Sequence, residues 1–175
     1  MIVPTAFRNC FQLAWITNDI ERSIAQFQNF YSVPSFFTME QEFAATVRGE
    51  TGVMKMRVAL ANVDDIQLEI IQPCGGIDAI YREVLPADGT HANVFHHICT
   101  KVNGTQADWD AYLRSLGPER PICYQGDIGK GGAFCFTDER ATLGLYMEHL
   151  WLGEEADAMM ARLVPTYRSP DYRKR

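Results

Sequence analysis

Val94-Phe95-His96-His97-Ile98-Cys99-Thr100-Lys101-Val102 is a short alternating segment that carries two of the four histidines of the chain. Such alternation is typical of a strand with one buried face. Because successive side chains of a strand point to opposite faces, His97 is expected on one face and His96 on the other. Cys99 and Lys101 share the face of His97. One imidazole is therefore expected to point into whatever the sheet encloses, either as a metal ligand or as a core residue.

The order of elements that begins at this stretch occurs twice in the chain. From residue 10 onward, the hydrophobic pattern predicts a strand, a helix and three further strands, and the stretch quoted above starts the same order again. Gln12 and His97 occupy the same place in the first strand of each unit. Glu69 and Glu148 occupy the same place in the last strand. The sequence therefore predicts an internal duplication.

We accordingly predict an α+β protein built of two tandem βαβββ modules. A turn-rich linker joins the modules, and a weak helical stripe with a basic end follows the repeat. All of these segments are expected to form one structural domain. The predicted boundaries are 8–76 for the first module, 77–93 for the linker, 94–152 for the second module and 153–175 for the C-terminal helix and tail.

Composition narrows the class of function. The chain has 175 residues, of which 47% are hydrophobic, and a formal charge of −6, so clustered cations for nucleic acid are not expected. No apolar run approaches the roughly 18 residues of a membrane span. The five cysteines are an odd number without a C-x-x-C pair, and the N-terminus has no secretory pattern. We expect a cytoplasmic protein with free thiols.

Four segments of the chain together resemble the vicinal oxygen chelate superfamily, and most closely its methylmalonyl-CoA epimerases and glyoxalases I. The superfamily also includes extradiol dioxygenases and the proteins of fosfomycin and bleomycin resistance. The resemblance covers residues 8–152. It rests on Phe11 to Glu21, on Leu68-Glu69-Ile70-Ile71-Gln72-Pro73 with the following glycines, on His96-His97-Ile98-Cys99, and on Gly144-Leu145-Tyr146-Met147-Glu148.

The resemblance implies that the two βαβββ modules form an open, barrel-like mixed sheet around a cavity. It also implies a divalent metal ion inside that cavity, with Zn, Ni, Co, Mn and Mg left open. The ligands that it implies are Gln12, Glu69, His97 and Glu148. Strand alternation independently places all four on the inward face. Two inward carboxylates beside a histidine are costly to bury without a cation, which favours a metal site.

The residue types favour proton transfer beside a carbonyl group. The dioxygenases and the fosfomycin-resistance proteins are similar in using two histidines, and Gln12 stands where the first of these would be. The metal is expected to polarise the carbonyl and stabilise an enediolate while a carboxylate moves the α-proton. Glu148 is the first candidate base and Glu69 its counterpart. Glu50 is a further candidate, because its expected loop at 48–52 is similar to one that carries an acid in the epimerase.

Three functions stay open at this point. An epimerase-like isomerase acting on an α-hydroxy-carbonyl compound or an acyl thioester leads, and a glyoxalase I-like lyase follows. The ligand set resembles that of one class of glyoxalase I. At the positions where proteins of that class carry their glutathione-binding side chains, however, this chain has Ile16, Pro73 and Asn93. The third is a non-catalytic protein that binds a small hydrophobic molecule in the same cavity. Family members are similar in often forming homodimers, which we expect here as well.

Three other residues receive smaller roles. His96 is expected to point away from the cavity and to be structural, and His149 is expected to face outward. The glycine-rich residues 126–132 are expected to form a mobile rim, with Lys130 placed to contact an anion.

Overall fold

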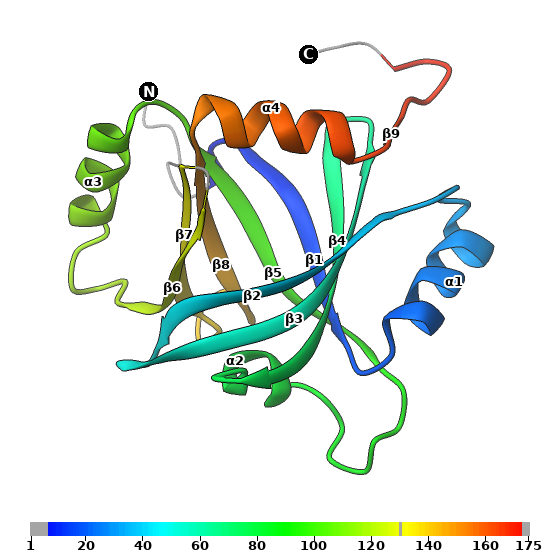
Figure 1. Cartoon of the computed structure of the whole chain (residues 1–175), viewed down its shortest axis with the longest axis horizontal. Coiled ribbons are helices and arrows are strands. Elements are labelled where there is room, and N and C mark those ends of the chain that lie inside the picture. Colours follow the sequence, from blue (N-terminus) through cyan, green and yellow to red (C-terminus); the bar gives the residue numbers. More distant parts are fainter. Residues whose placement is uncertain (1–6, 130, 173–175) are drawn as a thin grey trace.

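The computed structural model describes residues 7–129 and 131–172 (Figure 1). Lys130 and the last three residues of the predicted basic tail lie outside these ranges. The elements in chain order are β1 (Cys10–Thr17), α1 (Ile20–Tyr31), β2 (Phe37–Val47), β3 (Glu50–Val63), β4 (Ile66–Gly76), α2 (Ala79–Arg82), β5 (Asn93–Val102), α3 (Gln106–Ser115), β6 (Ile122–Gly129), β7 (Gly132–Glu139), β8 (Leu145–Leu152), α4 (Glu154–Leu163) and β9 (Thr166–Tyr167).

The strands of the described residues form one mixed sheet in the order β2-β6-β7-β8-β5-β1-β4-β3-β9, and β2 also pairs with β3. Because β2 pairs with both β3 and β6, strands β1 to β8 close into a barrel. The predicted α+β class with a barrel-like mixed sheet is confirmed. Closure leaves these strands without a long free edge on which another chain could pair.

Four neighbouring strands form the wall that carries the candidate site. β1 runs parallel to β4, and β5 runs parallel to β8. β1 and β5 lie side by side in antiparallel orientation and join the two halves of the barrel. The first and last strands of each predicted module therefore lie next to one another, although the module boundaries themselves stay a prediction.

Two predicted loops are wrong. The expected loop at 48–52 is a tight hairpin turn, because Arg48 and Gly49 both have positive φ, at 50° and 89°, and β3 starts at the next residue. Such two-residue turns match the twist of paired strands. The expected mobile rim at 126–132 is mostly strand, since β6 continues to Gly129 and β7 begins at Gly132.

The two longer helices at the sides are fixed at their N-termini by the residues that sequence patterns associate with caps. The Asp19 side chain accepts a hydrogen bond from the first turn of α1, and Thr105 and Asp108 form a capping box at α3. Each helix buries one aromatic side chain against the outside of the barrel, Phe27 in α1 and Trp109 in α3.

The two ends of the barrel are covered differently. Figure 1 shows α4 lying across one end and the short α2 at the opposite end, with α1 and α3 on opposite outer sides. Apolar side chains of β2, β3 and β7 fill much of the interior between the two ends. In the described ranges, no helix is long and apolar enough to cross a membrane.

Candidate metal centre

The four predicted ligands lie on the four adjacent strands of this wall. Gln12 is on β1, Glu69 on β4, His97 on β5 and Glu148 on β8. In the sheet register, Cys99 is opposite both Gln12 and Glu148, so the side chains of these strands meet on one level of the barrel interior. Alternation along each strand is the local reason that they point inward.

Three of the four side chains converge closely. His97 Nε2 lies 3.2 Å from Glu69 Oε2 and 3.2 Å from Glu148 Oε2. The three candidate ligand atoms all lie within 4.8 Å of one another. The His97 side chain is fully buried, and the two carboxylate side chains are 13% and 12% exposed. One imidazole nitrogen and two carboxylate oxygens at this spacing form a donor set that suits a divalent ion.

Two buried polar atoms at this place have no hydrogen-bond partner in the described part of the chain, His97 Nε2 and Gln12 Oε1. The Gln12 amide is oriented by its nitrogen, which donates to Gln67 Oε1 over 2.7 Å and leaves the oxygen free. Buried polar groups are normally paired, and an unpaired one calls for an explanation. Unpaired acceptors beside two carboxylates fit the predicted cation site.

The electrostatics of the cluster are those of buried groups in contact. Burial raises the pKa of the Glu69 carboxyl, because a charge is poorly solvated in the interior. Burial alone would lower the pKa of His97, but the neighbouring Glu148 and Glu69 outweigh it and raise that pKa to about 9.

Glu50 is not part of this cluster. It begins β3, pairs with Val47 beside the tight turn, and is exposed. It is also absent from the residues that line the cavity described below. The structure brings together Glu69 and Glu148 among the three predicted candidate bases, and it leaves Glu50 at the tip of a hairpin.

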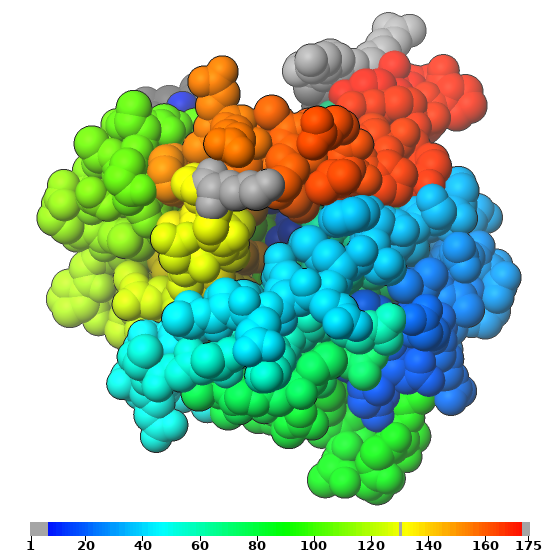
Figure 2. Space-filling view, in the orientation of Figure 1, coloured from blue at the N-terminus to red at the C-terminus, as the bar shows by residue number. Residues whose placement is uncertain are grey.

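The cluster opens into a cavity of about 360 Å³ between the barrel interior and α4. Figure 2 shows a narrow opening bounded by α4, β2 and the β6–β7 hairpin. Lys101 is the one Lys or Arg among the described lining residues, and it pairs with Asp157 of α4. Most of the remaining lining is apolar: Phe11, Met39, Met56, Leu60, Ile71, Ile128, Phe134, Phe136, Leu150, Leu152 and Met160.

His96 does not line the cavity, but it is buried in the interior and does not lie on an outer face. In the pairing of β5 with β1, His97 is opposite Ala14 and Phe95 is opposite Trp15, so His96 is the extra residue of a β-bulge. A bulge interrupts alternation and re-aims side chains. His96 is consequently buried beside His97, at 2% exposure, while Phe95 lies on the outer surface.

His149 also differs in detail from its prediction. It points away from the cavity as expected, but it is fully buried under α3, where its ring nitrogens contact Tyr112 and Thr137. Burial lowers the pKa of His149 to about 4.

Some functional neighbours were missed by sequence reasoning. Gln67 orients Gln12, and because it stands two residues before Glu69, strand alternation puts both on one face and could have identified it. Tyr81 lines the cavity from α2, and Asp157 reaches it from α4. These two come from the predicted linker and tail, where no pattern indicated which side would face the barrel.

Comparisons with known proteins support the fold. No family model matches the chain, and no curated protein sequence matches it. A methylmalonyl-CoA epimerase from Mycobacterium tuberculosis superposes with a TM-score of 0.54 at 12% identity, over 90% of this chain and 97% of that one. A variant of the Streptomyces coelicolor methylmalonyl-CoA epimerase, in complex with 2-nitronate-propionyl-CoA, gives 0.52 at 16% identity, over 84% and 96%.

Another methylmalonyl-CoA epimerase, in complex with methylmalonyl-CoA and NH4+, gives a TM-score of 0.52 at 15% identity, over 84% of this chain and 96% of that one. These enzymes are similar to the chain in architecture. The barrel is of the vicinal oxygen chelate type, as the sequence resemblance predicted.

Proposed function

We propose that this chain, which has the vicinal oxygen chelate fold, is a divalent-metal-dependent isomerase or lyase that removes a proton beside a carbonyl group. An epimerase-like reaction is the leading form. The observation that carries the proposal is the position of His97 Nε2, which is buried 3.2 Å from each of two carboxylates and lacks a hydrogen-bond partner among the described residues. A buried set of this kind is typical of a cation site.

The residues that would hold the ion are Gln12, Glu69, His97 and Glu148. A bound divalent ion supplies positive charge that polarises a substrate carbonyl and makes the neighbouring C–H group more acidic. The donor set contains one nitrogen and no thiolate, so it suits Zn, Ni, Co, Mn and Mg.

Glu148 is the base in this proposal, and Glu69 is its counterpart. Each carboxylate has one oxygen 3.2 Å from His97 Nε2, so both reach the place where the ion would bind. A proton removed by one carboxylate can be returned to the opposite face of a planar intermediate by the other, which is what an epimerisation requires. Glu50 takes no part, because it is exposed at the start of β3.

The cavity wall favours a substrate with a chelating oxygen group at one end and an apolar body. Its volume of about 360 Å³ lies within the range of small-ligand pockets. Apolar walls exclude water from the reacting carbon and strengthen the electrostatic effect of the charged groups. The acyl end of a thioester fits this description, and the similarity in fold to methylmalonyl-CoA epimerases supports that class.

The test is solvent deuterium exchange into a panel of acyl-CoA thioesters and hemithioacetals, with the protein loaded with each divalent ion in turn. We expect exchange in an acyl thioester, and its loss by at least about 1,000-fold in Glu148→Gln. Glu50→Gln is the matched control and should exchange at the unaltered rate. Undiminished exchange in Glu148→Gln would overturn the role of that residue, and exchange in the hemithioacetals alone would favour the lyase.

The apolar wall also favours a second function, a binding protein that holds a small hydrophobic molecule without converting it. The two functions differ in their need for metal. Elemental analysis of the purified chain after incubation with each ion separates them, because the absence of a stoichiometric ion would remove the enzymatic proposal.

A further inference from the structure

The hydrogen bonds of His96 determine which of its ring nitrogens carries a hydrogen. His96 Nε2 lies 3.1 Å from the main-chain oxygen of Ile80. A carbonyl oxygen only accepts hydrogen bonds, so His96 Nε2 must be the donor. In a neutral imidazole the other nitrogen then has no hydrogen and acts as an acceptor. His96 Nδ1 therefore presents a lone pair to its neighbour.

That neighbour is the candidate metal ligand. His97 Nδ1 lies 2.9 Å from His96 Nδ1, and both rings are buried. Because His96 Nδ1 accepts, His97 Nδ1 donates, and the neutral His97 ring keeps its free lone pair on Nε2. This is the atom that lies between Glu69 and Glu148.

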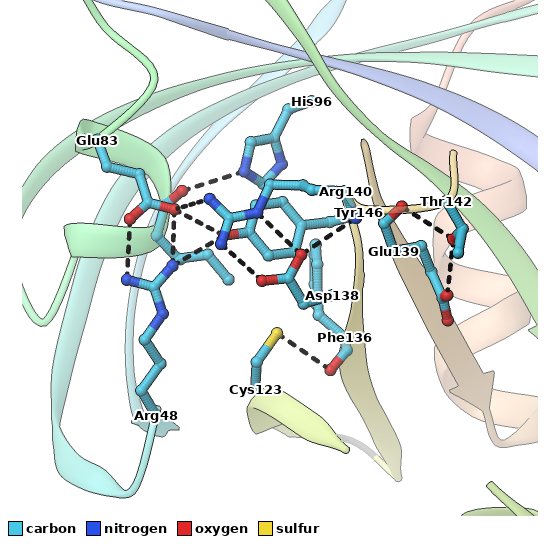
Figure 3. Close-up of polar contacts among 11 residues, drawn as sticks. Arg48, Glu83, His96, Cys123, Phe136, Asp138, Glu139, Arg140, Thr142 and Tyr146 are labelled. Carbon is cyan, nitrogen blue, oxygen red and sulfur yellow. Dashed lines mark hydrogen bonds and ion pairs between the residues drawn. The ribbon is translucent and has the colours of Figure 1, made fainter. Parts of the chain in front are cut away.

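The His96 ring is held in place from its other side as well. It stacks on Tyr146 with a centroid distance of 4.8 Å and an interplanar angle of 29°. The Tyr146 hydroxyl donates to Glu83 and accepts from Arg48, and Arg140 lies over the Tyr146 ring. Figure 3 shows His96 above the Tyr146 ring, with these charged side chains gathered around the hydroxyl. The ring orientation that the hydrogen bonds need is thus supported by a surface ion-pair cluster.

We propose that His96 is a positioning residue for the metal centre, which holds His97 in the tautomer and orientation that direct its Nε2 lone pair at the ion. The inference rests on the metal site of the proposed function. Ligating histidines usually donate their second N–H to a carboxylate, a carbonyl group or water, and loss of such a partner costs about 10- to 100-fold in metal affinity. Here the partner is a second imidazole, placed by the β-bulge and oriented by the Ile80 carbonyl.

The first experiment measures the affinity of the full chain for Zn²⁺ by calorimetric titration. His96→Leu should bind Zn²⁺ about 10- to 100-fold more weakly than the unaltered chain. His96→Gln should stay within about threefold, because its amide can accept from His97 and donate to Ile80. His149→Leu removes an equally buried histidine on the outer side of β8 and is the matched control, with Zn²⁺ affinity unchanged.

The second experiment is independent of how the variants fold. Histidine ¹⁵N spectra of the unaltered Zn²⁺-loaded chain should show hydrogen on His96 Nε2 and on His97 Nδ1. Hydrogen on His96 Nδ1 would overturn the inference, and so would a folded His96→Leu variant that binds Zn²⁺ as tightly as the unaltered chain. If the unaltered chain binds no divalent ion, the proposed function fails together with the inference, whereas equal binding by both chains removes the inference alone.

Discussion

The two halves of the candidate centre come from different halves of the chain and are supported in different ways. Gln12 on β1 is oriented through amide groups: its nitrogen donates to Gln67, whose nitrogen donates to Asn62. Asn62 in turn donates to Thr166 of β9, in an exposed contact. The amide chain therefore begins inside the barrel and ends at the solvent-facing C-terminal strand.

The half that carries His97 is supported through buried groups. His97 donates to His96, which donates to the Ile80 carbonyl, and both rings are buried. In each half, a hydrogen bond from the polar atom that does not face the ion fixes the orientation of the ligand. The solvent-facing end of the amide chain can exchange its partners for water, while a buried imidazole pair has no such substitute. We expect the His97 half to be the less tolerant of change.

The largest effect should follow from removal of the imidazole ligand. His97→Leu deletes one of the three clustered ligands and leaves Glu69 and Glu148 close together without a positive neighbour. We expect Zn²⁺ affinity to fall on the order of 1,000-fold, equivalent to about 4 kcal/mol. Calorimetric titration of the folded variant measures this, and affinity equal to that of the unaltered chain would show that His97 is not a metal ligand.

A second prediction concerns a histidine outside both halves. Burial lowers the pKa of His149 to about 4, below the ordinary value of 6.5, so the folded state favours the neutral ring. The contribution of the buried His149 to the free energy of unfolding is complete above pH 6.5 and is lost as the pH falls from 6.5 toward 4. Linkage predicts a loss of about 2 kcal/mol between pH 7.5 and pH 5.

Urea unfolding of the unaltered chain and of His149→Gln over this pH range checks the value. The variant should show the shallower dependence on pH, because glutamine does not titrate. If the free energy of unfolding depended on pH in the same way in both proteins, the lowered pKa of His149 would be contradicted.

Removal of the amide ligand should have a moderate effect. Gln12→Leu removes a neutral amide oxygen. Such an oxygen binds a divalent ion less strongly than the imidazole nitrogen of His97 does. We expect Zn²⁺ affinity to fall about 10- to 30-fold, equivalent to about 1.4 to 2 kcal/mol. A loss as large as that of His97→Leu would mean that the two halves contribute equally.

The smallest effect should come from the orienting amide. Gln67→Leu leaves Gln12 in place but removes the acceptor of its side-chain nitrogen. Because solvent can reach the outer part of this chain, we expect Zn²⁺ affinity to fall only about 3- to 10-fold, less than in His96→Leu. The same titration ranks the two variants, and the reverse order would invalidate the contrast between exposed and buried support.

The repeated order of elements predicted the two βαβββ modules, and the family resemblance predicted the barrel. Strand alternation was sufficient to place Gln12, Glu69, His97 and Glu148 on inward positions. It could do so because inward and outward side chains of a paired strand follow the period of the backbone itself. It failed at His96, where one extra residue breaks that period. The pairing partner of β5 determines where such a bulge lies, and that information is absent from the segment alone.

The loop that was expected to carry a third acid failed for a related reason. Arg48 adopts a positive φ, which is uncommon outside glycine, asparagine and aspartate, so the sequence offered no strong sign of a two-residue turn. With that turn, Glu50 falls at a hairpin tip. The sequence also did not predict that α4 covers the cavity. Its stripe of apolar residues is weak, and tertiary packing determines which of its residues face the barrel.

The bulge at His96 also divides β5 between two surfaces. Phe95 packs on Trp15 outside the barrel, whereas His97, Cys99 and Lys101 follow the interior. In a regular strand, all four of these odd-numbered residues would share a face. Deletion of His96 would restore the regular period. Either Phe95 would then point into the barrel, or His97, Cys99 and Lys101 would point out of it. The extra residue therefore acts as a phase change that lets one strand belong to the outer wall at its start and to the cavity at its end.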